Sequence, residues 1–253
     1  MQVRRASGRV EVIAGTPPVR SEGIGTTVQP LAAVEGRVLS GPFRVSVLAS
    51  RRGSDLQALI DAKERGEVSY EISLVICNVP GAMAIERAKK HGIPHLVMDH
   101  RGRDREEFDK EMTAALESCG TDLIVLAGFM RILSPWFVRR WKDRIVNIHP
   151  ALLPSFPGAH AHRDALSYGV KVTGLTIHFV DEDVDHGPII FQLPVAVMDD
   201  DTEESLSARV LMEEHIWYPR IVQWMAEGKV RRQGRRTIVE GYVPGTEAGP
   251  AGR

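Results

Sequence analysis

The stretch RIVNIHPALLPSFPGAHAH, residues 144–162, begins as a strand and continues as a rigid loop. Its first residues include β-branched isoleucine and valine, which favour a buried strand. Asn147 and His149 are two residues apart, so in a strand they share one face. The prolines and the glycine that follow favour an extended, turning path. A buried strand that ends in an amide and an imidazole indicates a site at its carboxyl end.

Strands and helices alternate along the chain around this stretch, which is the fifth expected strand. The fourth, DLIVLAG at 122–128, is almost wholly apolar, as a strand covered on both faces should be. The segments 172–180 and 188–197 are extended and apolar with no helix between them, so they should pair antiparallel. The pattern predicts a doubly wound, mostly parallel open α/β sheet of Rossmann-like type with a late antiparallel extension. Other strands are expected at 43–49, 70–78 and 94–99, helices from 54 and at 82–92, 104–118 and 135–141, and a hairpin at 230–240.

Two of the expected helices carry sequence signals for their first turns. Ser54 begins the first helix, and Gln57 three residues later completes a capping-box pattern. Asp201 and Glu204 are expected to cap a long helix late in the chain, and Pro219 is expected to kink that helix.

The composition is that of an ordinary globular protein, with 43% hydrophobic and 26% charged residues among 253 and a net charge of −1. A charge so close to zero argues against nucleic acid and acidic membranes as partners. No apolar run reaches the ~18 residues of a membrane span, and no signal-peptide pattern is present. Two well-separated cysteines fit a reducing compartment, so a cytoplasmic protein is expected. Both a monomer and a homodimer are compatible with the sequence.

The two ends of the chain differ from its middle. Residues 1–42 are broken by Gly, Pro, Ser and Thr and are expected to form a weakly ordered N-terminal extension, although RVEVIAG at 9–15 could be a short strand. Residues 242–253 are expected to form a C-terminal tail. The folded domain is therefore expected over 43–241.

Two further segments bear on the Asn147–His149 pair. HFVDEDVDHGPII, residues 178–190, is an acidic loop after a strand, and one of its carboxylates could orient His149 and favour its charged form. ASRRGSDLQ, residues 49–57, leads into a helix whose N-terminal N–H groups suit a phosphate. Each feature taken alone also has an ordinary structural explanation. Asn147 could cap the strand end, His149 could be a buried histidine with its hydrogen bonds satisfied, the acidic segment could be a solvated turn, and residues 49–57 could be an ordinary helix start. The sequence lacks GxGxxG and Walker motifs, the usual signals of dinucleotide and nucleoside triphosphate binding.

Together with LAGFMRILSPWFV, residues 126–138, these segments resemble the phosphoribosylglycinamide formyltransferases, the folate-dependent enzymes of purine synthesis. The resemblance covers the chain from about residue 43 to about residue 241 and implies a formyltransferase domain there. The catalytic residues that it implies are Asn147, His149 and Asp185. The implied formyl-folate pocket consists of Arg105, Met130, Arg131, Ile132, Leu133, Asn147 and the loop from Val180 and Asp181 to Asp185. The implied ribonucleotide site consists of Arg51, Arg52, Gly53, Ser54 and Glu214.

The reaction that the resemblance implies is direct formyl transfer from 10-formyltetrahydrofolate to the amine of glycinamide ribonucleotide, a step of de novo IMP synthesis. Asn147 and protonated His149 would stabilise the oxyanion, and His149 would protonate the leaving N10. Asp185 would keep His149 charged. Zinc on His149, His160 and His162 is another possibility, since imidazoles bind zinc. The neighbouring acids and the resemblance favour a site without metal.

Two positions depart from the family pattern. Where the family's phosphate loop usually reads Ser-Gly-x-Gly-Ser, residues 50–54 read Ser-Arg-Arg-Gly-Ser, and a helical position that is often Lys or Gln is Leu211. A phosphate-binding charge has thus moved from the helix to the loop in our interpretation. Formyltetrahydrofolate deformylase is an alternative function, although that family tends to have a second histidine where this chain has Pro150. A nonenzymatic folate- or nucleotide-binding module is a further alternative, and it predicts a damaged catalytic trio.

Overall fold

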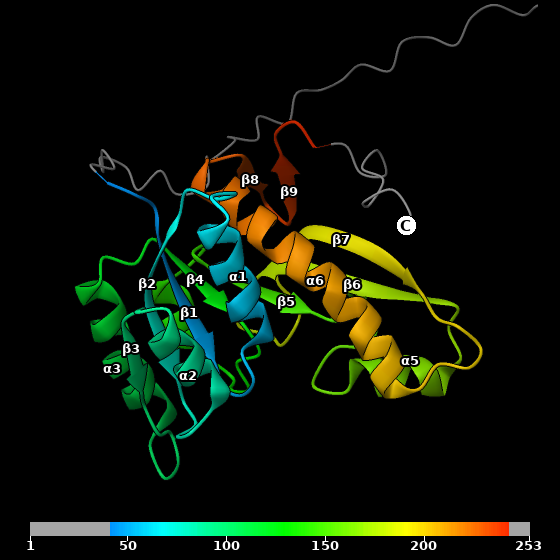
Figure 1. Cartoon of the computed structure of the whole chain (residues 1–253), viewed down its shortest axis with the longest axis horizontal. Helices are drawn as coiled ribbons and strands as arrows, with labels where there is room; N and C mark the ends of the chain where they lie inside the picture. Colours follow the sequence, from blue (N-terminus) through cyan, green and yellow to red (C-terminus); the bar gives the residue numbers. More distant parts are fainter. Residues whose placement is uncertain (1–40, 243–253) are drawn as a thin grey trace, which may run out of the picture.

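The computed structural model describes residues 41–242, which form a seven-stranded sheet with helices on both faces and a small two-stranded sheet (Figure 1). The strands are β1 (Arg44–Ala49), β2 (Glu71–Cys77), β3 (His95–Val97), β4 (Leu123–Leu126), β5 (Ile145–His149), β6 (Val172–Phe179), β7 (Ile189–Ala196), β8 (Val230–Gln233) and β9 (Arg236–Val239). The helices are α1 (Ser54–Glu64), α2 (Met83–Lys90), α3 (Arg105–Ser118), α4 (Pro135–Arg140), α5 (Ala161–Tyr168) and α6 (Glu203–Ala226).

The topology of the large sheet confirms the predicted fold class. Its strand order is β3-β2-β1-β4-β5-β6-β7, and neighbours are parallel from β3 to β5. β6 pairs antiparallel with both β5 and β7, and β8 and β9 form the predicted hairpin. The direction of winding reverses between β1 and β4, and open α/β sheets bind ligands at the carboxyl ends of the strands at such a point.

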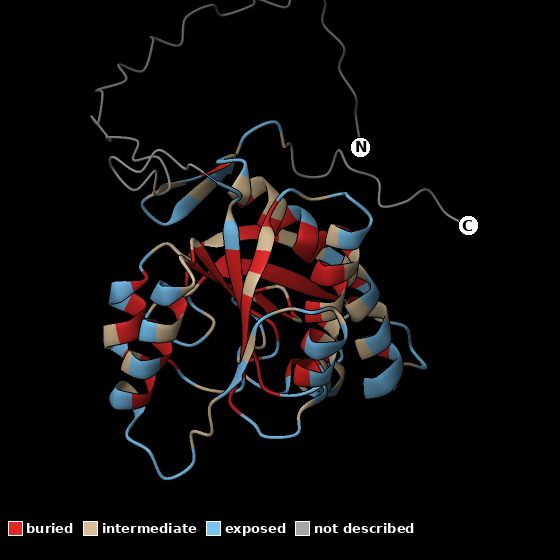
Figure 2. Ribbon diagram, turned by 60° about the vertical axis from the view of Figure 1, so that its left-hand side comes forward, coloured by how far each residue is buried: buried red, intermediate tan, exposed pale blue. Residues whose placement is uncertain are grey.

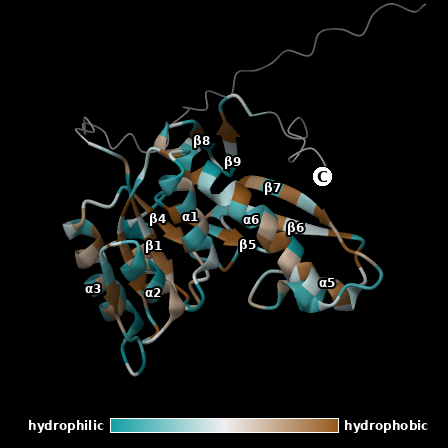
Figure 3. Cartoon of the chain, in the orientation of Figure 1, coloured by the Kyte–Doolittle hydropathy of each residue, from teal (hydrophilic) through white to brown (hydrophobic). Residues whose placement is uncertain are grey.

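Side chains alternate along the strands and build a separate core on each face of the sheet. In β1, Val45, Val47 and Ala49 pack with residues of α1, α2 and α6, whereas Leu48 packs with residues of α3 and α4. Figure 2 shows the buried strands between these helical layers, and Figure 3 shows that the strands carry many of the most hydrophobic residues. Because helices cover both faces, the carboxyl edge of the sheet is the place left for a ligand.

The turn between β1 and α1 corrects the predicted capping box at Ser54. The N-cap is Gly53, in the left-handed conformation with a φ of 65°, and no side chain caps the helix. A Cβ at Gly53 would lie 2.9 Å from the Cβ of Ala84, so this turn packs tightly against α2. Gln57 is drawn away from the cap, because its amide nitrogen donates to Asp61 Oδ1 at 2.7 Å. Tertiary packing has therefore replaced the local cap.

The start of α6 corrects a second predicted cap by one residue. Thr202 is the N-cap, and its side chain forms a capping box with Ser205. Asp201 lies just outside the helix and accepts two hydrogen bonds of 2.7 Å from the Arg209 guanidinium. The helix then continues through Pro219 to Ala226.

Residues 1–40 and 243–253 lie outside the described part of the chain, and with them RVEVIAG and nearly all of the expected extension and tail. Tyr242 was expected to begin the tail, but its ring packs against Phe191 and Trp224 at centroid distances of 5.7 and 5.5 Å. Within residues 41–242 no helix combines the length and the apolarity needed to cross a membrane.

Candidate active site

The loops that follow β1 and β4 are tied together at the carboxyl edge of the sheet. The backbone N–H of Ser50 donates to the Gly128 carbonyl at 3.1 Å, and the Ser50 hydroxyl accepts from the Met130 N–H at 2.7 Å. The same hydroxyl donates to Asn78 Oδ1 at 2.6 Å. These bonds fix the segment 128–133 at the end of β4, which pairs with β5, the strand that carries Asn147 and His149.

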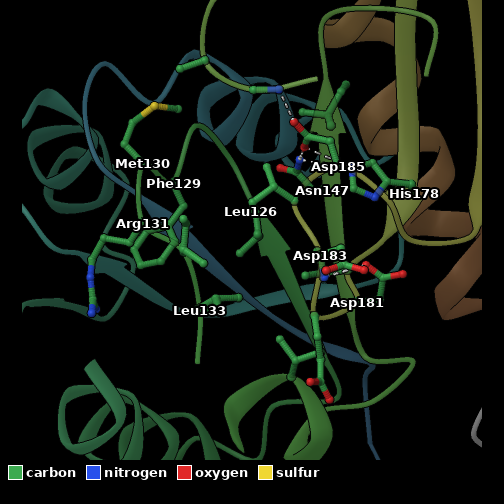
Figure 4. A pocket seen from close by; sticks show the side chains of 18 of the residues that line it. Leu126, Phe129, Met130, Arg131, Leu133, Asn147, His178, Asp181, Asp183 and Asp185 are labelled. Atoms are coloured by element: carbon green, nitrogen blue, oxygen red, sulfur yellow. Dashed lines mark hydrogen bonds and ion pairs between the residues drawn. The ribbon is translucent and has the colours of Figure 1, made fainter. Parts of the chain in front are cut away.

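A cavity of about 390 Å³ lies between segment 128–133, β5 and the acidic loop 180–185 (Figure 4). Its volume falls within the range of ~300–1,000 Å³ typical of small-molecule pockets. Figure 4 shows Asn147, Asp185 and His178 close together beside the cavity, with Arg131 on another side of it. Apolar wall residues include Met130, Ile132, Leu133, Val138 and Val180. The arrangement offers an apolar slot with a group of convergent polar side chains, as a site for a heterocycle would.

His149 is almost fully buried and has an acceptor at each ring nitrogen. Nε2 lies 2.8 Å from the Phe156 carbonyl oxygen, and Nδ1 lies 3.3 Å from Asp185 Oδ2. A carbonyl and a carboxylate only accept, so this geometry suits an imidazolium that donates from both nitrogens. The sequence-based expectation that a carboxylate of the acidic loop reaches His149 is confirmed at Asp185.

Asn147 faces the same carboxylate and one further histidine. Its amide nitrogen donates to His178 Nε2 at 3.2 Å and lies 3.5 Å from Asp185 Oδ1. His178 stands directly opposite Asn147 in the antiparallel pairing of β5 and β6. Burial lowers the pKa of His178 below its usual value, although the Phe179 carbonyl and the Asp185 carboxylate act in the other direction. The amide nitrogen is thus held between two acceptors at the cavity wall.

The acidic loop is held in place by backbone features. Asp185 has a φ of 52°, in the left-handed region that aspartate tolerates better than most residues. Its Oδ2 accepts from the Gly158 N–H at 2.7 Å, which joins the acidic loop to the proline-rich loop, residues 150–160 between β5 and α5. A Cβ on Gly187 would lie 1.7 Å from the Phe179 carbonyl oxygen, so the loop can close on β6 only with glycine there. Both loops therefore meet at Asp185.

The residues implied for a formyl-folate pocket line the cavity, with the exception of Arg105. Met130, Ile132, Leu133, Val180 and Asp181 line the cavity with Asn147 and Asp185. Arg131 also lines it, but its guanidinium lies 4.1 Å from the Phe108 ring centroid and 3.5 Å from Asp109. Arg105 begins α3, is exposed and does not line the cavity. Its role at the site stays a prediction.

The residues implied for a ribonucleotide site lie at the first strand-to-helix turn, outside the cavity lining. Arg51 and Arg52 are exposed, and neither forms an ion pair with another residue of the described range. Gly53 is buried, and Ser54 is the first residue of α1. The turn therefore presents a helix N-terminus that follows two exposed arginines without an ion-pair partner among residues 41–242, which suits an anion.

Glu214 reaches the same turn from α6, where it forms a buried acid pair with Asp55. Burial raises the pKa of Asp55 to about 6. Burial, and then the charge of Asp55, raise the pKa of Glu214 well above its usual value. Asp55 Oδ1 has no hydrogen-bond partner in the described part of the chain and lies 3.7 Å from His215 Nε2. Buried acids with raised pKa values gather at functional sites, and these two lie in and beside the first turn of α1.

Three residues of this site escaped the sequence-based prediction. His178 and Thr176 are two apart in β6, the same spacing that singled out Asn147 and His149 in β5. The Thr176 hydroxyl donates to the Ala151 carbonyl at 2.7 Å and so holds the proline-rich loop. The φ of Phe156 is 53°, an unusual conformation for a bulky residue, and its carbonyl contacts His149. The period-2 spacing in β6 was available as a signal, whereas the Phe156 conformation was not.

His162, one of the three histidines considered for zinc, lies near the site in the first turn of α5. Burial lowers its pKa, as does the neighbouring His149, while Glu203 acts in the other direction. Its Nδ1 is buried without a hydrogen-bond partner among residues 41–242. In the same range no three His, Cys, Asp or Glu side chains are placed to hold a metal ion.

Comparison with known proteins places this geometry in a family. Residues 43–222 match the formyl transferase family. The chain belongs to that family. A phosphoribosylglycinamide formyltransferase of Escherichia coli (strain K12) is 39% identical over 209 residues, which are 79% of this chain and 99% of that protein. A crystal structure of glycinamide ribonucleotide transformylase 1 from Symbiobacterium toebii superposes with a TM-score of 0.76 at 42% identity, covering 78% of this chain and 94% of the other.

Members of the formyl transferase family differ in size and in the activity for which they are named. The trifunctional purine biosynthetic protein adenosine-3 of Drosophila pseudoobscura pseudoobscura is 45% identical over 90% of this chain, but the chain spans only 17% of that protein's length. A formyltetrahydrofolate deformylase structure from Pseudomonas syringae pv. tomato has a TM-score of 0.74 at 30% identity, covering 79% of this chain and 66% of that one. The family and the fold of the chain are therefore established. The named relatives differ in what receives the formyl group, an amine in one case and water in the other.

Proposed function

We propose that this formyl transferase moves the formyl group of 10-formyltetrahydrofolate to the amine of glycinamide ribonucleotide. The observation that carries the proposal is the trio of Asn147, His149 and Asp185: Asn147 and Asp185 line the apolar cavity, and His149 lies behind them with Nδ1 3.3 Å from Asp185 Oδ2. The E. coli relative named phosphoribosylglycinamide formyltransferase matches along 99% of its length, which supports the same acceptor.

The trio accounts for stabilisation of the formyl oxygen, which gains negative charge during the reaction. When an amine adds to the formyl carbon, that oxygen becomes an oxyanion, and a donor aimed at it lowers the barrier. The Asn147 amide nitrogen lies at the cavity wall, where one N–H faces His178 Nε2 and the other, with only a 3.5 Å contact to Asp185 Oδ1, would turn to the oxyanion. An imidazolium at His149 adds a positive charge beside it, and Asp185 stabilises that charge at 3.3 Å. Removal of one such donor typically costs about 10²–10³ in rate.

His149 also accounts for the proton balance. The amine nitrogen forms a bond to the formyl carbon and loses a proton, while the carbon–N10 bond breaks and N10 gains a proton. The Nδ1 of His149 faces Asp185, a residue of the cavity wall, so Nδ1–H is the proton available on that side. The proton that the amine loses then returns to the imidazole, so His149 is charged again at the end of each turnover. No acyl-enzyme is required, because a neutral primary amine is itself a nucleophile.

The cavity fits the formyl folate as cosubstrate. Apolar side chains of segment 128–133 and Val180 form walls for a flat ring, and the acidic loop supplies acceptors for ring N–H groups. The ribonucleotide would bind from the other side, with its phosphate at the N-terminus of α1 near Arg51 and Arg52 and its polar groups near Glu214. The trio then lies where the two substrates meet.

Deformylation is the second candidate function, since a deformylase structure shares the fold at 30% identity. Water replaces the amine in that reaction, so the anion-binding turn at residues 51–54 would have no ligand. The two functions separate in steady-state rates of tetrahydrofolate formation with and without glycinamide ribonucleotide. The proposal requires a rate that saturates with ribonucleotide and nearly vanishes without it. A rate that is the same in both reactions would identify a deformylase.

A further inference from the structure

His178 is a buried histidine of the site whose hydrogen bonds define its protonation. Nδ1 lies 2.8 Å from the Phe179 carbonyl oxygen, which can only accept, so Nδ1 carries a proton. Burial lowers the pKa of the ring and so favours its neutral form, in which Nε2 carries no proton and lies as an acceptor 3.2 Å from the amide nitrogen of Asn147. The side chain is 2% exposed, and solvent therefore does not compete for either nitrogen. The ring is neutral, with its one acceptor aimed at Asn147.

The direction of the Asn147 amide depends on that acceptor. An amide can turn by 180° and exchange its oxygen and nitrogen, and only its partners decide between the two orientations. Here both atoms that face the nitrogen, His178 Nε2 and Asp185 Oδ1, are acceptors. The reversed amide would point its oxygen at the carboxylate and lose both interactions. These two acceptors therefore hold the amide nitrogen of Asn147, and not its oxygen, on the side that faces His178 and Asp185.

We infer that His178 is a positioning residue for formyl transfer: as a neutral acceptor it takes one N–H of the Asn147 amide, fixes the orientation of that amide and so leaves the second N–H, now 3.5 Å from Asp185 Oδ1, for the oxyanion. The inference rests on the proposed function, because the donor matters only if an oxyanion forms beside it. His178 touches no reacting atom, and it acts through Asn147. It stands opposite Asn147 in the β5–β6 pairing, so the sheet itself sets the distance between the two.

The surrounding charges bear on which protonation state is stable. Asp185 and Asp181 of the acidic loop favour a charged His178, while His149 of β5 disfavours it, and burial outweighs the two acids. A charged ring would present an Nε2–H to the amide nitrogen, which cannot accept. It would lie 3.8 Å from Asp185 Oδ1 and draw the carboxylate away from Asn147. The neutral ring is thus required for the orientation described above.

Two substitutions of His178 separate the contributions of its two ring nitrogens. His178→Gln can keep an acceptor oxygen near the position of Nε2, whereas His178→Asn keeps a donor near Nδ1 and loses the acceptor. We expect His178→Asn to lower kcat by about tenfold to a hundredfold with KM changed by less than about threefold, because only transition-state binding is lost. His178→Gln should retain kcat within about threefold. Melting curves of both variants control for folding.

A double substitution tests whether the effect passes through Asn147. In an Asn147→Ala background, His178→Asn should change kcat by less than about twofold, because two residues that act as one unit are not additive. An undiminished loss in that background, or a wild-type kcat in His178→Asn, would overturn the inference.

A spectroscopic measurement tests the tautomer independently of activity. In two-bond ¹H–¹⁵N spectra of the full chain at pH 7.5, with the His178 signals assigned by their loss in His178→Gln, Nδ1 should be protonated and Nε2 bare. A charged ring or the opposite tautomer would overturn the inference even in an active enzyme. A wild-type protein with this tautomer but no ribonucleotide-dependent turnover would instead refute the proposed function.

Discussion

The substitution Asp55→Asn should stabilise the protein at neutral pH and leave it nearly unchanged in acid. Asp55 is 8% exposed, and burial raises its pKa from 3.8 to about 6. A folded state that raises the pKa of an acid favours its protonated form, so ionisation of Asp55 destabilises the fold. The destabilisation should grow as pH rises from about 4 to about 6 and be complete above that window. An amide has the same shape and cannot ionise, so it should avoid this loss.

The size of the effect follows from the pKa shift. A shift of about two units corresponds to roughly 3 kcal/mol at about 1.4 kcal/mol per unit. Asp55 lies in the first turn of α1, where loss of a negative charge forfeits about 0.3–1 kcal/mol of interaction with the helix N-terminus. The net gain in the free energy of unfolding should therefore be about 2 kcal/mol at pH 7.5, or roughly 4–8 °C in Tm.

Thermal and urea unfolding at pH 4.0, 5.0, 6.0 and 7.5 would measure this gain. The matched control is Asp200→Asn, which removes an exposed carboxylate and should change stability little at any of these pH values. The difference between Asp55→Asn and the parent should be small at pH 4.0 and should reach its full value by pH 7.5. A variant that is less stable than the parent at pH 7.5, or equally stabilised at both ends of the range, would refute the reasoning.

Three further tests by substitution probe the proposed reaction. His149→Ala should lower kcat by a factor of about 10²–10⁴, as loss of a general acid does, while exposed His160→Ala should stay near the parent. Equal rates for the two variants would rule out this role. Asp185→Asn removes the carboxylate that favours protonated His149, so the optimum of the pH–rate profile should move to lower pH, and a profile that only scales down would contradict this. Arg51→Ala combined with Arg52→Ala should raise the KM for ribonucleotide about tenfold and leave the KM for formyl folate unchanged. The double change should also weaken the salt dependence of ribonucleotide binding, whereas an unchanged ribonucleotide KM would mean that the backbone N–H groups alone bind the phosphate.

Hydrophobic patterning was sufficient to predict the sheet. A strand covered by helices on both faces is apolar throughout, whereas a strand with one buried face alternates apolar and polar residues. It was equally sufficient to place Asn147 and His149 on one face of β5, since that depends only on a spacing of two. The capping box at Ser54 failed for a tertiary reason. Gly53 packs against Ala84, and Gln57 is held by Asp61 instead of the helix start.

The contacts between strands could not be derived from local patterns. His178 becomes the partner of Asn147 only through the register of β5 on β6, which depends on how the chain closes the sheet. The buried pair of Asp55 and Glu214 joins residues far apart in sequence, so no spacing rule would reveal their raised pKa values. The position of Arg105 outside the cavity lining likewise depends on where α3 begins relative to the loops.

The fate of the formyl carbon in a single turnover tests the central claim most directly. Excess enzyme is mixed with 10-formyltetrahydrofolate labelled at the formyl carbon, with and without glycinamide ribonucleotide, and the label is separated into formate and formylated ribonucleotide. Formyl transfer predicts that the label appears on the ribonucleotide amine in step with tetrahydrofolate, and that almost no formate forms without the ribonucleotide. Label released as formate at the same rate in both mixtures would contradict the proposed acceptor.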